Sequence, residues 1–170
     1  MRSTARIILA LICSALAVMW VYALFFASKE AVNKIGDTAW TQRAEQRCLE
    51  AERERETLAD YRLITDAGVN GLRQRADIVD KATDTIDAML ATLRNDMPSD
   101  EKGRAIVPMW LDEYEQHVAD RREYATQLRD GNNAPFSETT FEGLPLAERL
   151  ATFAGDNRMP ACAPPIDLSV

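Results

Sequence analysis

Cysteines are the residues whose chemistry the sequence constrains most clearly. The chain has three, at positions 13, 48 and 162. Cys13 lies in an uncharged apolar run, whereas Cys48 and Cys162 lie in the polar sequence that follows it. In an oxidising compartment, pairing is the expected state of two such cysteines. We therefore expect a Cys48–Cys162 disulfide that closes most of the polar chain into one loop, with two free thiols as the alternative.

The other residues that could carry chemistry are a single histidine and many acidic residues. The single histidine, His117, has no further ligands at zinc-site spacing, so we expect it at the surface or boundary of a helix. Asp84 and Asp87 lie one helical turn apart, a spacing that suits acid–base catalysis or calcium binding. In a chain with 27 acidic residues such pairs arise by chance. We interpret them as parts of surface salt bridges, such as Glu115 with Arg122 or with neighbours across helices.

Neither motifs nor net charge point to catalysis or to nucleic acid. The sequence contains no CxxCH, CxxC, GxSxG, Walker or GxGxxG motif, so we expect no enzyme activity, no cofactor and no metal site. Arg2 and Arg6 are the only charged residues before Lys29, which leaves 18 of the 20 basic residues and all 27 acidic residues in the polar part, a net charge of −9. Such a charge disfavours nucleic acid and anionic membrane surfaces as partners.

An apolar run over residues 7–27 contains no charge, proline or glycine. As a helix it spans roughly 30 Å, the thickness of a bilayer's hydrocarbon core. Because Arg2 and Arg6 precede it, we predict a cytoplasmic N-terminus (1–6), a transmembrane helix (7–27) and an extracytoplasmic remainder in the cell membrane. The alternative is a cleaved signal peptide. That alternative fits less well, because signal peptides have a shorter apolar core of about 7–15 residues and an A-x-A site that is missing near Ala27.

Small residues recur on one face of this predicted helix. Ala10, Cys13, Ser14 and Ala17 stand at i, i+3, i+4 and i+7. A face of small side chains lets another transmembrane helix approach closely. We interpret the stripe as a docking face for a membrane partner. The alternative is chance, since alanine and serine are common in membrane helices.

The polar part predicts three helices. Residues 28–35 are expected to prolong the membrane helix, and strong helix formers fill residues 40–64. A turn at 66–71 precedes a second helix that ends at Met97-Pro98. Ser99 is the expected N-cap of a third helix, which Pro108 either kinks or delays to a start near Val107, and Gly131 is its expected C-cap. The short connection makes these last two helices an antiparallel hairpin.

Apolar residues at three- and four-residue spacing define the expected core faces. The first helix contributes Trp40, Ala44, Cys48, Ala51, Leu58 and Tyr61; the second contributes Leu72, Ala76, Val79, Thr83, Ile86, Leu90 and Leu93; and the third contributes Val107, Leu111, Tyr114, Val118, Ala125 and Leu128.

After Gly131 the helical pattern weakens. We expect a loop at 132–135, an irregular hairpin about Glu142-Gly143 and a short helix at 146–153. The side chains expected to lie on the bundle are Phe136, Phe141, Leu144, Leu146, Leu150 and Phe153. The predicted fold class is all-α: the transmembrane helix continues into an extracytoplasmic three-helix bundle (28–131), and an irregular, disulfide-tied C-terminal segment (132–170) packs on it.

The last third of the chain carries a resemblance. Its motifs are Asp120-Arg121-Arg122-Glu123-Tyr124-Ala125 and Leu128-Arg129-Asp130-Gly131 within residues 114–131, then Phe136, Phe153-Ala154, Asn157 and Met159-Pro160-Ala161-Cys162-Ala163-Pro164-Pro165. They resemble a family of uncharacterised actinobacterial single-pass membrane proteins. The resemblance implies an extracytoplasmic domain and a structural role for Cys162, and it implies no activity.

These observations favour an accessory protein. We expect a non-catalytic structural subunit of a larger cytoplasmic-membrane complex, such as a respiratory or transport assembly, docked through its membrane helix and external helices. The alternative is an extracytoplasmic domain that binds a small molecule or acts as a sensor through a partner protein, since only six residues precede the anchor. An enzyme of the cell envelope ranks third.

Overall fold

The structure is a computed structural model that describes residues 2–26, 30–58 and 70–168. It divides into two compact units, residues 1–32 and residues 33–170. Helices dominate both units, and the described residues contain only one two-stranded sheet.

The first unit is the helix α1, Arg2–Phe25. Its segment Arg6–Phe25 has a mean hydropathy of 2.5 and is unburied, so α1 is long and apolar enough to cross a membrane by length and composition. The apolar helix predicted over residues 7–27 is thus present as far as Phe25; residue 27 lies outside the described residues.

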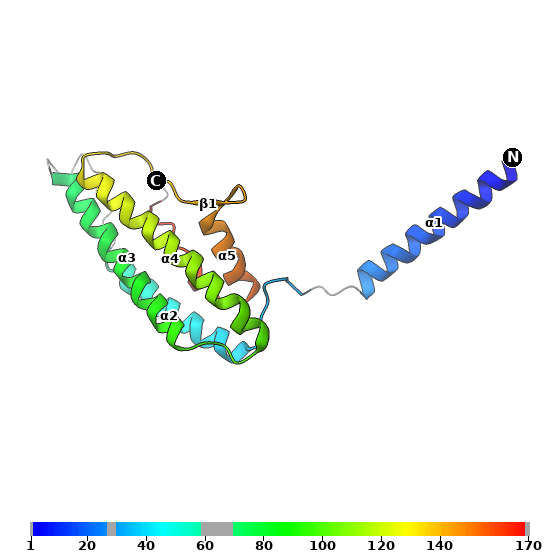
Figure 1. Cartoon of the computed structure of the whole chain (residues 1–170), viewed down its shortest axis with the longest axis horizontal. Helices are drawn as coiled ribbons and strands as arrows, with labels where there is room; N and C mark the ends of the chain where they lie inside the picture. Colours follow the sequence, from blue (N-terminus) through cyan, green and yellow to red (C-terminus); the bar gives the residue numbers. More distant parts are fainter. Residues whose placement is uncertain (1, 27–29, 59–69, 169–170) are drawn as a thin grey trace. The chain divides into compact units, whose positions relative to one another are not determined.

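The second unit contains α2 (Thr38–Glu56), α3 (Gly71–Asn95), α4 (Glu101–Arg129), β1 (Thr140–Phe141), β2 (Leu144–Pro145), α5 (Leu146–Asp156) and the 3₁₀ helix η2 (Pro160–Cys162). α3 and α4 lie side by side as an antiparallel pair, α2 packs on α3, and α5 packs on α4 (Figure 1). The short helix η2 returns the C-terminal segment to α2 and α5.

The expectation that residues 28–35 prolong the membrane helix is wrong for its described part, because residues 30–35 are not helical. α2 begins as a separate helix at Thr38, where the Asp37 carboxylate accepts a hydrogen bond from the Trp40 N–H at 2.8 Å and caps it. Upstream, the buried Ile35 donates its N–H to Asn157 Oδ1 at 2.9 Å, so this segment belongs to the core of the second unit.

The predicted core faces are buried on all three long helices. Buried as expected are Trp40, Ala44, Cys48 and Ala51 of α2; Ala76, Val79, Thr83, Ile86, Leu90 and Leu93 of α3; and Val107, Leu111, Tyr114, Val118, Ala125 and Leu128 of α4. Leu58 and Leu72 are half-buried, and Tyr61 and most of the predicted turn at 66–71 lie outside the described residues. The expectation for the C-terminal segment is wrong at Phe141 and Leu144, which are 50% and 46% exposed.

Two aspartates cross-link the starts of α2 and α4, and we call this pair the aspartate clasp. Asp37 caps α2 and also accepts hydrogen bonds from Ser99 Oγ at 2.7 Å and Ser99 N at 2.9 Å. Asp100 caps α4 by accepting from Gly103 N at 2.9 Å and also accepts from the backbone N–H groups of Gly36 and Asp37. The expected cap, Ser99, is therefore wrong by one residue. The hydrogen bonds from Ser99 hold the pKa of Asp37 at about 2.

Glycines with positive φ shape the end of α4 and the turn of the hairpin. Gly131 has a φ of +86°, and the N–H groups of Gly131 and Asn132 donate to the carbonyls of Leu128 and Gln127. This arrangement is a Schellman cap, which confirms the predicted role of Gly131. At the hairpin, Glu142 and Gly143 both take positive φ between β1 and β2, as a two-residue turn requires.

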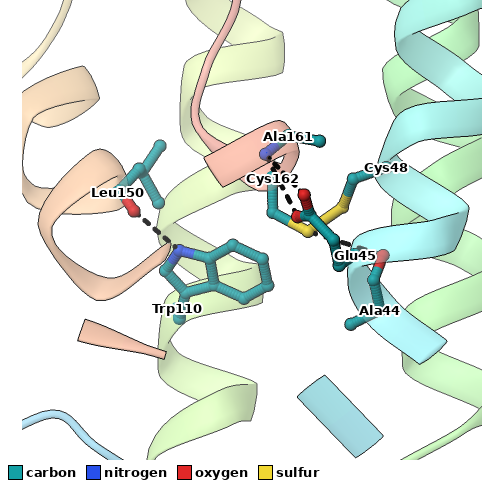
Figure 2. The surroundings of a disulfide bond; sticks show 7 residues. All are labelled: Ala44, Glu45, Cys48, Trp110, Leu150, Ala161 and Cys162. Carbon is teal, nitrogen blue, oxygen red and sulfur yellow. Dashed lines mark hydrogen bonds between the residues drawn. A yellow bond between two sulfur atoms is a disulfide. The ribbon is translucent and has the colours of Figure 1, made fainter. Parts of the chain in front are cut away.

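The expected disulfide is present. Cys48 of α2 and Cys162 of η2 are joined by an S–S bond of 2.03 Å, and both residues are fully buried (Figure 2). Beside the bond, Glu45 accepts a hydrogen bond from the N–H of Ala161 at 3.1 Å, so η2 is held to α2 by a polar contact as well as a covalent one.

Replacing both bridged cysteines by alanine should destabilise the protein. The bridge spans 114 residues, for which loop-closure entropy sets an upper loss of about 5 kcal/mol. We expect a clearly lower melting temperature of the full-length protein in detergent and faster proteolysis after Gly131. Cys13→Ser is the control and should leave the melting temperature unchanged; a double variant as stable as wild type would contradict the role of the bridge.

Gly103→Ala should break the aspartate clasp. An added Cβ would lie 2.7 Å from both Asp100 Oδ1 and Pro98 Cγ, so the cap must shift at a cost of about 1–3 kcal/mol. Gly155→Ala is a matched control in α5, because nothing lies within 4 Å of its Cβ position, and it should be neutral or slightly stabilising. Equal chemical denaturation midpoints for the two variants would be inconsistent with this account.

Candidate functional site

A groove lies between α4 and α5 in the described part of the second unit. Its volume is about 320 Å³, and its lining residues are Asn33, Ile106, Met109, Trp110, Glu113, Leu144, Glu148, Arg149, Thr152 and Phe153. Three structural elements build it: one face of α4, one face of α5, and strand β2, which leads into α5. We call it the α4–α5 groove.

The floor of the groove is made of packed aromatic rings. Trp110 stacks on Phe153 with ring centroids 4.9 Å apart, and Tyr114 meets the Trp110 ring edge-on at 5.6 Å. The indole N–H of Trp110 donates to the Leu150 carbonyl at 3.3 Å, so it ties α4 directly to α5 (Figure 2). Because Trp110 and Phe153 are buried, the floor is formed before anything binds.

The rim of the groove is apolar and exposed. In the described part of residues 33–168, four large apolar side chains are exposed: Met109, Phe141, Leu144 and Ile166. Met109 and Leu144 line the groove, and Phe141 pairs with Leu144 across the hairpin. Three of the four large exposed apolar side chains in the described part of the second unit therefore lie at or beside the groove. Contiguous exposed apolar patches mark interaction surfaces or ligand-binding grooves.

Three charged side chains stand at the groove. Arg149 pairs with Glu113, with Nη2 2.5 Å from Oε1, and its guanidinium carbon lies 4.5 Å from the centre of the Phe141 ring. Glu148 is exposed and its carboxylate has no hydrogen-bond or ion-pair partner among residues 30–58 and 70–168. The groove thus presents one unpaired negative charge beside apolar side chains, and its lining residues include no cysteine, serine or histidine.

An ion pair between a buried arginine and a partly exposed aspartate lies further along α4. Arg121 is fully buried, forms a bidentate pair with Asp167 at 2.7 and 2.8 Å, and donates Nε–H to Thr83 Oγ1 at 3.0 Å. Burial raises the pKa of Asp167, but the Arg121 hydrogen bonds and charge outweigh it and the pKa is lowered overall. This contact fixes the C-terminal segment to both α3 and α4, which is a structural role.

His117 lies next to this pair, and the expectation that it sits at the surface is wrong. It is 2% exposed, and neither ring nitrogen has a hydrogen-bond partner among the described residues. The rings of Tyr114 and Phe136 flank it edge-on at 6.0 Å, and Nδ1 is 3.5 Å from Glu138 Oε2. Burial, reinforced by the charge of Arg121, lowers the pKa of His117 to about 4, so the ring is neutral at pH 7.

The carboxylate pairs form salt bridges between helices. Asp84 and Asp87 of α3 both contact Arg122 of α4, at 2.6 Å each. Glu115 of α4 pairs with Arg94 of α3, which is the expected alternative of a neighbour across helices, and not with Arg122. In the described ranges no group of three or more His, Cys, Asp or Glu residues is arranged to hold a metal ion.

Of the site residues predicted from sequence, the structure brings together Cys48 and Cys162. The four small residues Ala10, Cys13, Ser14 and Ala17 lie on α1 with exposed side chains, and Cys13 is a free thiol. Their docking role stays a prediction. The α4–α5 groove was missed, although the apolar residues Phe141 and Leu144 beside the predicted turn were a usable signal.

Comparisons with models of protein families, with curated proteins and with solved structures found no match. The resemblance to an actinobacterial membrane family therefore stays a prediction, and the functional argument depends on the geometry.

The buried histidine predicts an acid-sensitive stability. An unfolded histidine has a pKa near 6.5 and His117 has a folded pKa of about 4, so the unfolded state binds the proton more readily between these values. The contribution of His117 to the free energy of unfolding should be fully present above pH 6.5 and should fall as the pH drops towards 4. The expected loss between pH 7.5 and pH 5 is about 2 kcal/mol. His117→Phe should flatten this dependence. Melting temperatures over pH 5–7.5 test it, and an equally steep profile in the variant would refute the assignment.

Proposed function

We infer that this protein is a non-catalytic accessory subunit of a larger membrane complex, anchored by α1 and contacting other subunits with its outer helical unit. The observation that carries this proposal is the gathering of Met109, Phe141 and Leu144 at the α4–α5 groove, in a unit whose other large apolar side chains are mostly buried. Exposing such a surface to water costs free energy, and a partner that covers the surface removes this cost.

The proposed orientation is N-terminus in the cytoplasm and outer unit outside. Arg2 and Arg6 before the apolar run favour it. The disulfide also supports it, because structural disulfides persist in oxidising compartments and are rare in the cytosol.

The contents of the groove favour binding over chemistry. Glu113 is neutralised by Arg149, so it is poorly suited to act as a general base. A small-molecule or sensory role is the second candidate, because about 320 Å³ falls at the lower end of the range for ligand pockets. Thermal-shift screening of the full-length protein against small metabolites addresses that candidate, and a saturable stabilisation by one of them would favour it over the accessory role.

The small-residue face of α1 gives the first test of docking. Replacing Ala10 and Ser14 together by leucine should push a neighbouring helix away, and we expect at least a threefold loss of co-purifying membrane proteins in mild detergent, measured by quantitative mass spectrometry. Ile12→Leu with Met19→Leu, off the stripe, is the matched control. Unchanged recovery in the Ala10/Ser14 variant would remove this face from the proposed interface.

A further inference from the structure

We propose that the α4–α5 groove binds an amphipathic helix of a partner membrane protein, one that presents apolar side chains a turn apart and a lysine or arginine beside them. Apolar side chains would cover Met109 and Leu144, and the basic residue would pair with Glu148. Such binding is the helix-in-groove mode, in which an amphipathic helix lays its apolar face between two others.

Size and shape point to side chains as the occupant. A space of about 320 Å³ accommodates a few large apolar side chains and is too small for a folded domain. The Trp110 and Phe153 rings form a rigid floor, so ordering it on binding costs little conformational entropy. The hydrogen bond from Trp110 to Leu150 fixes the spacing of the two helices that form the walls.

Charge selects a basic partner. Glu113 and Arg149 cancel, which leaves Glu148 as the uncompensated charge of the lining. The sequence after Ala27 carries a net charge of −9, so an anionic lipid headgroup would be repelled at this surface. A lysine or arginine gains from the same field, and steering by it raises the rate of encounter.

Asn33 is held at the edge of the groove. It is one of the lining residues. Asn33 cannot drift from the groove, because its carbonyl accepts from Asn157 Nδ2 at 3.0 Å and its own amide donates to Asp156.

Site-specific photocrosslinking in the full-length protein in its own membranes tests this proposal. A benzophenone amino acid replaces Met109, and the control position is Glu123, which is exposed on α4 and does not line the groove. We expect a crosslink from position 109 alone, to a peptide of another membrane protein that carries apolar residues with a lysine or arginine. A crosslink only to lipid, only to a second copy of this chain, or to a peptide without a basic residue would overturn the proposal.

A charge reversal gives an independent readout. Glu148→Lys should lower recovery of the crosslinked partner at least threefold in mild detergent, whereas Glu123→Lys should leave it unchanged. The groove proposal rests on the accessory function proposed above, so the experiment must distinguish failure of one from failure of the other. Equal recovery of the partner with Glu148→Lys and with Glu123→Lys would refute the groove as its binding site and leave the accessory function standing. Absence of any co-purifying partner even for the wild-type protein would refute both proposals.

Discussion

The bond between Cys48 and Cys162 is the constraint on which the second unit depends. It joins α2 to the far end of the chain and so encloses α3, α4, the hairpin and α5 in one covalent loop. α5 is only eleven residues long and would not be stable as an isolated helix. Because η2 is fixed to α2 beyond it and the hairpin precedes it, α5 is held against α4, and the groove between them is a consequence of that placement.

Polar contacts, in addition to the disulfide, hold the C-terminal segment on the helices. Arg121 binds Asp167 after the disulfide, and Asn157 binds the backbone of Asn33 and Ile35 before it. Each joins segments far apart in the sequence. Arg121 is fully buried, so removing Asp167 would leave its guanidinium buried without a counter-charge. The C-terminal segment is thus held by a few specific contacts as well as by apolar area, and it presents Phe141 and Leu144 outward.

Helices and their buried faces were predictable because local periodicity determines them. Ala76, Val79, Ile86 and Leu90 recur at helical spacing, and Gly131 marks an end that only a residue tolerant of positive φ makes easily. The burial of Arg121 and His117 was not predictable in this way, because the residues that cover them, Asp167 and Phe136, come from a segment without a repeating pattern. The separate start of α2 was missed for a related reason: half of the aspartate clasp comes from Ser99 and Asp100, more than sixty residues away.

The proposed accessory role rests on a surface that is formed, apolar and charged on one side, and on the helix α1, which is long and apolar enough to cross a membrane. Its most direct test is the size and composition of the full-length protein when it is extracted from its own membranes at native abundance in mild detergent. The account predicts a defined assembly, larger than one chain, that contains at least one other membrane protein. A monodisperse, partner-free species of this chain would contradict it.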